Sequence, residues 1–241
     1  MSKYYYDLHI HSCLSPCGSD DMTPATICGM CALNGINLAA LTDHNTAKNC
    51  PAFFKAAKFY GIVPIAGMEL TTAEDIHVVC LFPELENALE FDSAVESHRM
   101  KIPNRPAIFG HQLIMNEEDE VTGRDEFLLI TATDIPIDSA AAFVREYGGI
   151  CYPAHIDREA NGVISALGTF PKNCGFNVYE LNDCSNAQRY EKAYGLQGLK
   201  SVVSSDAHYL DKLKEKNEYF EVNDEVYSSS LVRSLVLEQL G

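Results

Sequence analysis

The chain has 241 residues, of which 46% are hydrophobic, so it is long enough to bury one substantial core. Thirty-four acidic against eighteen basic residues give a formal net charge of −16, which would repel long polyanions such as duplex DNA. No apolar run approaches the roughly 18 residues that a membrane-spanning helix needs, so we expect no membrane partner.

The start of the chain and its cysteines favour a cytoplasmic protein. Charged residues interrupt the first residues, 1–7, before any apolar region of the kind found in a signal peptide. The nine cysteines show no repeated zinc-ribbon spacing, and a disulfide framework is not expected in a chain this long without a secretion signal. We therefore expect a cytoplasmic location, with most thiols buried as small apolar groups.

Short apolar runs alternate with helical patterns along the chain. The runs that we expect to form strands are Tyr4–Ile10, Ile36–Leu41, Ile62–Met68, Val78–Phe82, Ile150–Ala154, Phe176–Leu181 and Lys200–Ser204. The expected helices are Pro24–Asn34, Pro51–Tyr60, Leu85–Met100, Asp138–Tyr147, Asn186–Tyr194 and Ser229–Leu240. This alternation predicts a mostly parallel sheet with helices outside it, closed into a barrel; an open doubly wound sheet is the alternative.

The segment Lys101–Thr133 breaks this alternation. It contains two prolines near its start and the acidic run 117–120. We interpret it as an insert or lid beside the barrel, and a solvated surface excursion is the alternative. No GxGxxG or GxxxxGK[ST] motif occurs in the chain, so the usual glycine-rich loops that bind nucleotide phosphates are missing.

Side chains that can bind metals lie at the ends of the expected strands. They are Asp7, His9 and His11; Asp43 and His44; Glu69; His77, which precedes its strand; His155; and Asp206 and His208. The carboxyl ends of parallel strands form the edge where α/β proteins build active sites. His9 and His11 also share one strand face, because side chains alternate with period two.

The types of ligand indicate which metals fit. Histidine nitrogen with carboxylate oxygen suits zinc, manganese or iron, and the cysteines offer no obvious set. So many ligands exceed the needs of one ion, which implies two or three divalent ions, with a carboxylate such as Glu69 bridging two of them.

In order along the chain, these residues resemble the motifs of the PHP family, the polymerase and histidinol phosphatase superfamily. The matching stretches are Asp7-Leu8-His9-Ile10-His11-Ser12, Leu41-Thr42-Asp43-His44-Asn45, Gly67-Met68-Glu69 with His77-Val78-Val79, Pro153-Ala154-His155, and Ser205-Asp206-Ala207-His208. The resemblance extends from Asp7 to His208. It implies a distorted (β/α)7 barrel, here one PHP-type domain over residues 1–241, which holds a trinuclear metal site.

The resemblance also implies how the ligands divide among three ions. The first ion would be held by His9, His11, Glu69 and Asp206, and the second by Glu69, His77 and His155. The third would be held by His44, His208 and one residue of the loop after His11. In that loop many members have Ser-Asp-Gly or a histidine, whereas this chain has Ser15-Pro16-Cys17-Gly18-Ser19-Asp20-Asp21. Asp20 is our choice by chemistry and Cys17 fits better by count.

The expected function is hydrolysis of a small phosphomonoester or a nucleotide phosphate, because close divalent ions can lower the pKa of water and supply hydroxide. We expect the catalytic residues to be His9, His11, Glu69, Asp206 and His208. Two arginines are candidates for binding the phosphate group: Arg158, three residues after His155, and Arg105, in the insert. The alternatives are a metallohydrolase of amides or lactones and a non-catalytic metal-binding module.

Four further residues lie outside the proposed ligand set. Asp43 either binds a metal or orients His44, and both alternatives stay open, whereas Asp7 is expected to be a supporting or structural carboxylate. His98 and His111 match no motif. The expected partner is a small phosphorylated substrate, including a nucleotide, and long nucleic acid is not expected.

Overall fold

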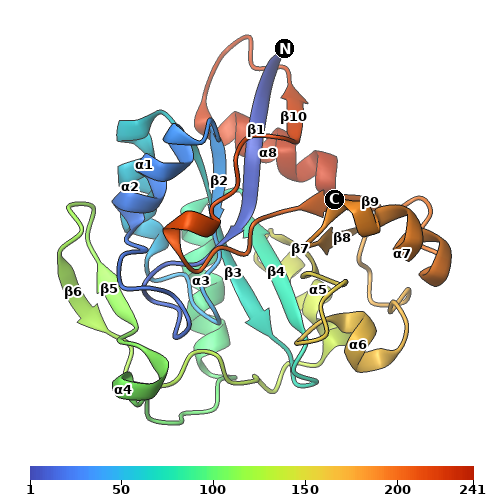
Figure 1. The fold of residues 1–241 in the computed structure, drawn as a ribbon, viewed down its shortest axis with the longest axis horizontal. Coiled ribbons are helices and arrows are strands. Elements are labelled where there is room, and N and C mark those ends of the chain that lie inside the picture. The colour runs from blue at the N-terminus through green and yellow to red at the C-terminus, as the bar shows by residue number, and fades with distance from the viewer.

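The computed structural model describes residues 1–241, which form a mixed α/β protein (Figure 1). The strands are β1 Ser2–Ile10, β2 Leu38–Leu41, β3 Val63–Thr71, β4 His77–Phe82, β5 Leu113–Met115, β6 Val121–Arg124, β7 Ile150–Pro153, β8 Val178–Leu181, β9 Lys200–Val203 and β10 Tyr219–Val222. The helices are α1 Pro24–Leu33, α2 Cys50–Tyr60, α3 Leu85–Glu96, α4 Pro106–Phe109, α5 Ile137–Glu146, α6 Val163–Leu167, α7 Ala187–Tyr194 and α8 Ser229–Leu240, with 3₁₀ turns η1 Cys184–Asn186 and η2 Leu210–Lys212.

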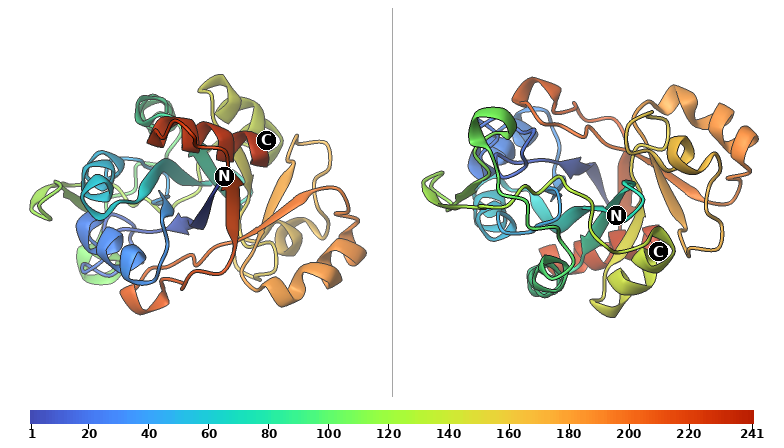
Figure 2. Two further views of the ribbon diagram at one scale, coloured as in Figure 1. Left: turned by 90° about the horizontal axis from the view of Figure 1, so that it is seen from above. Right: turned by 90° about the horizontal axis from the view of Figure 1, so that it is seen from below.

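The main sheet is a curled half barrel with strand order β10-β1-β2-β3-β4-β7. A separate parallel pair, β8 and β9, lies beyond β7, and a bridge between Ile10 and Ala207 links the segment after β9 back to β1. Figure 2 shows most helices around the outside of the strands, whereas the red α8 lies across the end of the half barrel beside the N-terminus. None of the helices is both long enough and apolar enough to cross a membrane.

The sheet is mixed, so the expectation of a mostly parallel sheet was wrong. β4 runs antiparallel to both β3 and β7, and β10 runs antiparallel to β1. Only the residues 72–76 join β3 to β4. A parallel crossover needs a dozen residues or more, so this connection can only make a hairpin.

Two hydrophobic clusters cover the two faces of the sheet. The larger lies between strands and outer helices, and the smaller fills the concave side, where Tyr4, Tyr6 and Leu8 pack with residues of α8. In β1 one extra residue lies between Asp7 and Ile10, opposite Ala39–Leu41 of β2. Such a bulge re-aims the side chains that follow it, which is why Leu8 joins the concave cluster while Ile10 joins the outer one.

The segment 101–133 folds as α4 and the β5–β6 hairpin, and it is tied to the protein along its length. The Asn49 side-chain amide donates to the Leu113 carbonyl at 3.1 Å, and Asn45 donates to the carbonyls of Leu129 and Thr131. The Asp125 carboxylate, buried, pairs with Lys48 at 2.7 Å and with Arg99. The Leu113 amide also donates to the Cys13 carbonyl at 2.9 Å, so the segment lies beside the loop that follows His11.

Candidate metal centre

The bulge in β1 brings its two histidines to the open end of the half barrel. His9 Nε2 lies 3.0 Å from His11 Nε2, and both side chains are fully buried. The expectation that the two imidazoles share one face agrees with this distance.

The Glu69 carboxylate lies at the centre of the site. Its two oxygens are within 2.8–3.3 Å of ring nitrogens from five histidines, which are His9, His11, His44, His77 and His155. Glu69 sits on β3 and His77 begins β4, and the antiparallel register of this hairpin pairs Thr71 with His77. Because β4 runs in the reverse direction, its first residue lies at the same edge as the last residues of β3.

Two of the predicted ligands adopt backbone conformations that non-glycine residues seldom adopt. His155 follows β7 with φ 27°, and Asp206 lies after β9 with φ 50°. Left-handed backbone costs free energy in such residues and persists where the surroundings require it, typically at functional sites. Asp206 Oδ1 lies 3.2 Å from His11 Nε2 and 3.6 Å from His208 Nδ1.

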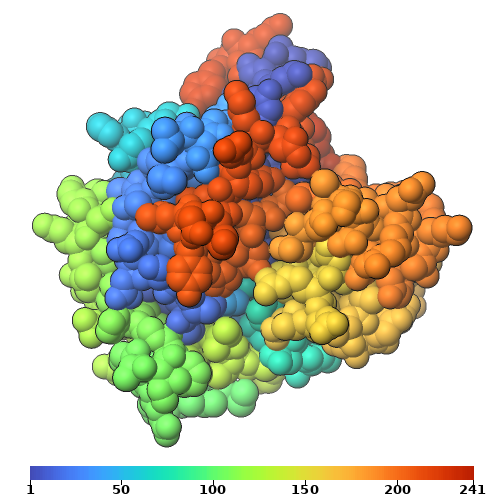
Figure 3. Space-filling view, in the orientation of Figure 1, coloured from blue at the N-terminus to red at the C-terminus, as the bar shows by residue number.

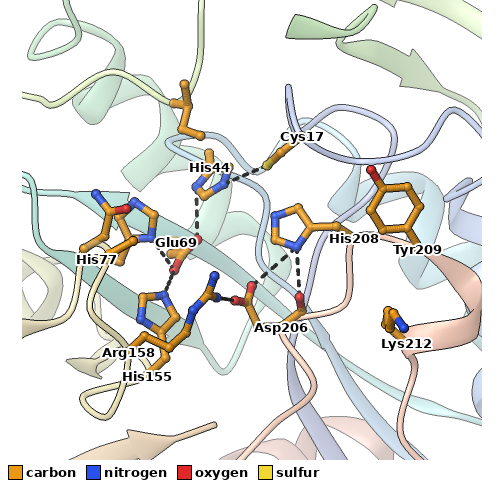
Figure 4. Close-up of a pocket in the computed structure, with 13 residues that line it drawn as sticks. Cys17, His44, Glu69, His77, His155, Arg158, Asp206, His208, Tyr209 and Lys212 are labelled. Carbon is orange, nitrogen blue, oxygen red and sulfur yellow. Dashed lines mark hydrogen bonds and ion pairs between the residues drawn. The ribbon is translucent and has the colours of Figure 1, made fainter.

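Three groups of ligand atoms lie close enough together to hold ions. They are His9, His11, Glu69 and Asp206; His44, Glu69 and His77; and His11, His44 and His208, each with its ligand atoms within 4.8 Å of one another. A cavity of about 430 Å³ opens over them (Figure 4). His155 Nε2 approaches the same Glu69 oxygen as His77, at 3.2 Å.

Several donor atoms of the site are buried without a hydrogen-bond partner, and a bound cation would provide one. His44 Nδ1, Glu69 Oε2 and Asp206 Oδ1 are buried and have no hydrogen-bond partner. Buried polar groups without partners are rare in folded proteins and require an explanation. Bonds of about 2.1 Å to histidine and carboxylate match the spacing of these groups, so the residues present fit divalent ions.

The protonation of Glu69, His44 and His208 suits metal binding. Burial opposes ionisation of Glu69, but His77, His9 and His44 around it hold its pKa well below the ordinary value. Burial, reinforced by the neighbouring His11, lowers the pKa of His44 to about 4 and that of His208 to about 3. These two imidazoles are therefore neutral at pH 7, which is the form that binds metals. Burial opposes protonation of His9 and His11, but the carboxylates around them raise the pKa of His9 and raise that of His11 to about 9.

The loop after His11 presents Cys17, and not Asp20, to the cavity. Cys17 Sγ lies 3.3 Å from His44 Nε2. The Asp20 carboxylate accepts instead from His111 Nδ1 at 2.7 Å, and both of these side chains are about half exposed. The Ser19 amide donates to the His208 carbonyl at 2.9 Å, which fixes the loop in this orientation.

Of the two predicted phosphate-binding arginines, the structure brings one to the cavity. Arg158 lines it and pairs with Asp206, whereas Arg105 lies exposed at the start of α4. The loop of Arg158 is held in place, because Asp157 accepts from the amides of Asn182 and Asp183. A Cβ on Gly162 would lie 2.4 Å from the Arg158 carbonyl, so this tight turn requires glycine.

Sequence reasoning missed Glu180, which lies on β8 and is buried. Its Oε2 accepts from His9 Nδ1 at 2.8 Å and from the His155 amide at 3.1 Å. A carboxylate that holds the far nitrogen of a metal-binding histidine fixes the tautomer and the ring orientation. The available signal was a single acidic residue inside the apolar run Phe176–Leu181.

Asp43 and Asp7 contact the backbone and side chains around the ligands. Asp43 accepts from the hydroxyl of Ser15 at 2.7 Å, and that hydroxyl lies 2.9 Å from His11 Nδ1. Asp43 thus supports His11 through a serine and does not touch the His44 ring. Asp7 accepts from the Ser205 amide at 3.0 Å, next to Asp206.

Comparisons with known proteins agree with this arrangement. The family model of the PHP domain matches residues 7–159, which is more than half of the chain. A comparison with curated proteins finds no match.

Several solved structures share the fold at low sequence identity. The lesion-specific endonuclease EndoQ from Pyrococcus furiosus is 21% identical, with a TM-score of 0.69, over 100% of this chain and 57% of that one. This chain thus spans little more than half the length of the endonuclease. A presumed metal-dependent phosphoesterase from Bifidobacterium adolescentis is 16% identical, with a TM-score of 0.62, over 98% and 96% of the two chains. An amidohydrolase from Chromobacterium violaceum is 17% identical, with a TM-score of 0.57, over 91% and 92%.

The family match covers four of the five ligand motifs. The fifth motif, Asp206–His208, contacts the His11 ring, and Asp206 belongs to the same group of possible ligands as Glu69. The chain therefore belongs to the PHP domain family of metal-dependent hydrolases.

Proposed function

We propose that this chain is a metal-dependent phosphoesterase that hydrolyses a small phosphomonoester, including a nucleotide, at a site for three divalent ions. The observation that carries the proposal is the Glu69 carboxylate in contact with five histidines, beside Asp206 and the cationic Arg158. Zinc, manganese and iron suit this donor set.

The ligand assignment is the one that the family resemblance implies. The first group of donor atoms matches it, whereas the second group has His44 in place of His155 and the third adds His11. We propose His9, His11, Glu69 and Asp206 for the first ion, Glu69, His77 and His155 for the second, and His44 and His208 for the third. Cys17 is the loop residue closest to this third position, and we prefer it to Asp20, which contacts His111 instead. We also propose a distorted (β/α)7 barrel as the description of residues 1–241, with the segment 101–133 as its insert.

Bound ions of this kind acidify water and offset the charge of a phosphoryl group. Among the residues of the chain, Arg158 provides a planar pair of donors that matches phosphate oxygens. Glu180 and the Asp43–Ser15 pair hold His9 and His11 in a fixed orientation. The burial of His9, His11 and Glu69 keeps bulk water away, which strengthens every electrostatic contact in the site.

Arg158 favours a phosphate substrate over an amide or a lactone. A phosphate-free substrate offers no anion for a guanidinium at the cavity wall. The net charge of −16 opposes long nucleic acid, so we propose a small substrate although one structural relative is an endonuclease.

A substrate screen tests the proposal. Metal-free protein receives manganese, zinc or iron separately and is offered phosphomonoesters, nucleotides, duplex DNA with an abasic site, and amide and lactone substrates. Phosphate release from small esters is expected. Hydrolysis of only the phosphate-free substrates, or of DNA alone, would overturn the proposed substrate class.

Variants test the site itself. His9→Ala and Asp206→Ala should abolish turnover while the circular dichroism spectrum stays unchanged. His98→Ala is the matched control, because His98 pairs with Asp134 on the surface, away from the cavity. Full activity in either ligand variant would refute the assignment.

A further inference from the structure

Tyr209 and Lys212 form one wall of the cavity next to the ligand cluster. Tyr209 directly follows His208, and the 3₁₀ turn η2, Leu210–Lys212, comes next. The Lys212 amide donates to the Tyr209 carbonyl at 3.0 Å. Tyr209 is the extended residue before this turn and Lys212 is its last residue, and the side chains of both line the cavity (Figure 4).

The backbone of this wall is anchored on both sides. The His208 carbonyl accepts from the Ser19 amide at 2.9 Å, and the Leu213 carbonyl accepts from the Asn34 side chain at 3.1 Å. Leu213 is buried in the outer hydrophobic cluster. Figure 3 shows the orange-red segment after β9 passing between the blue N-terminal part and the orange α7 part. The ring of Tyr209 is therefore carried on a fixed support.

Tyr209 differs from the tyrosines that pack elsewhere in the protein. Its side chain is 53% exposed, and it takes part in none of the aromatic or cation–π contacts of the structure. Tyr219, with similar exposure, packs on Tyr5 and under Lys3. Apart from the histidines, Tyr209 is the one aromatic residue that lines the cavity, so its face is available to a ligand.

We propose that Tyr209 stacks against the base of a nucleoside monophosphate whose phosphate lies at the ligand cluster and Arg158. An aromatic face binds any nucleobase by stacking and needs no base-specific hydrogen bonds. Lys212 lines the same cavity. Its ammonium, which lies 3.3 Å from the exposed Asp211 carboxylate, brings a positive charge to this wall that attracts the anionic ester. A cavity of about 430 Å³ is within the range of sites for small ligands and cofactors.

This inference rests on the proposed phosphoesterase function and narrows it to nucleotides. The test compares adenosine 5′-monophosphate with ribose 5-phosphate, which has the same sugar phosphate without a base. In Tyr209→Ala, the ratio of kcat/KM for adenosine 5′-monophosphate to that for ribose 5-phosphate should fall about tenfold, and Tyr209→Phe should restore it. Tyr227→Ala, at an exposed tyrosine outside the cavity, is the matched control and should leave the ratio unchanged.

A second readout does not depend on turnover of the nucleotide. Adenosine should inhibit hydrolysis of ribose 5-phosphate competitively, with a Ki about tenfold higher in Tyr209→Ala than in the unaltered protein. An unchanged ratio together with an unchanged Ki would overturn the stacking role. The role would also be overturned if Tyr209→Ala lost activity toward histidinol phosphate, a phosphate monoester that carries an imidazole ring, and lost none toward the nucleotide.

Failure of the proposed phosphoesterase function gives a different result from failure of the Tyr209 stacking role. If the metal-loaded protein hydrolyses no phosphate ester, the phosphoesterase function is refuted. Binding of adenosine 5′-monophosphate is then measured by equilibrium dialysis. Weaker binding to Tyr209→Ala than to Tyr227→Ala supports the stacking role, and equal binding overturns it.

Discussion

Glu180 offers the sharpest test of how the protein holds its metal site. Its Oε2 accepts both the His9 Nδ1–H, at 2.8 Å, and the His155 amide, at 3.1 Å. In Glu180→Gln an amide oxygen at that position can still accept both bonds but carries no charge. A hydrogen bond to a charged group is stronger than a neutral one by about 1 kcal/mol, so the zinc affinity should fall roughly fivefold.

Glu180→Ala should have a larger effect. It leaves the His9 ring free to change tautomer and removes the acceptor of the His155 amide, and losses of this kind lower metal affinity by about 10- to 100-fold. The affinity is measured by competition with a chelator of known strength, with circular dichroism to check the fold. Glu191→Gln is the matched control, because the Glu191 carboxylate accepts from the hydroxyl of Tyr179, the residue before Glu180, at 3.3 Å and contacts none of the proposed ligands.

A graded loss, small for glutamine and large for alanine, would support orientation of His9 by Glu180. Zinc affinities within twofold of the unaltered protein in both variants would refute this reasoning. Equal losses in Glu191→Gln would show that the effect is general destabilisation.

Three further predictions follow from contacts described above. Cys17→Ala should lower the metal content measured by elemental analysis by about one ion per chain, while Asp20→Asn should not; the reverse result would favour Asp20. Arg158→Ala should raise KM for a phosphomonoester at least tenfold, from the loss of a charge-assisted contact of about 1.5–3 kcal/mol, whereas Arg105→Ala should leave it near the original value. Burial opposes ionisation of Asp125, but Lys48 and Arg99 hold the pKa of its carboxyl group below the ordinary value. The carboxylate therefore stabilises the fold fully above the unfolded-state pKa of about 4, and this stabilisation is lost as the pH falls through the folded-state pKa. Asp125→Asn should therefore lower Tm at pH 7 and make little difference at pH 2–3, and an equal effect at both pH values would contradict this account.

The proposed ligands could be found in the sequence because they lie at or near strand ends, and strand ends are local features. Asp206 and His155 follow their apolar runs directly, so position in the chain was enough to expect them at one edge. Their left-handed backbone, in contrast, depends on the surrounding fold and leaves no mark in the residue type.

The missed features depend on long-range pairing. The direction of β4 follows from the short connection after Thr71, which the apolar pattern alone does not reveal. Glu180 lies within a run whose pattern is that of an ordinary strand. Only the packing of the strands determines which face of this strand points toward His9. β10 pairs with the start of β1 at a separation of more than 200 residues, so no local signal predicts it.

The hairpin of β3 and β4 has a consequence for how the protein tolerates change in length. Glu69 and His77 keep their spacing because the paired strands are in register, whereas the turn at residues 72–76 is exposed at its tip, residues 73–75, and carries none of the proposed ligands. An extra residue in that turn would cost little, since closing a slightly longer loop is entropically cheap. One extra residue within either strand would rotate every later side chain to the opposite face and swing a ligand into the outer core. Natural variation in length should therefore accumulate in the turn and be absent from the strands.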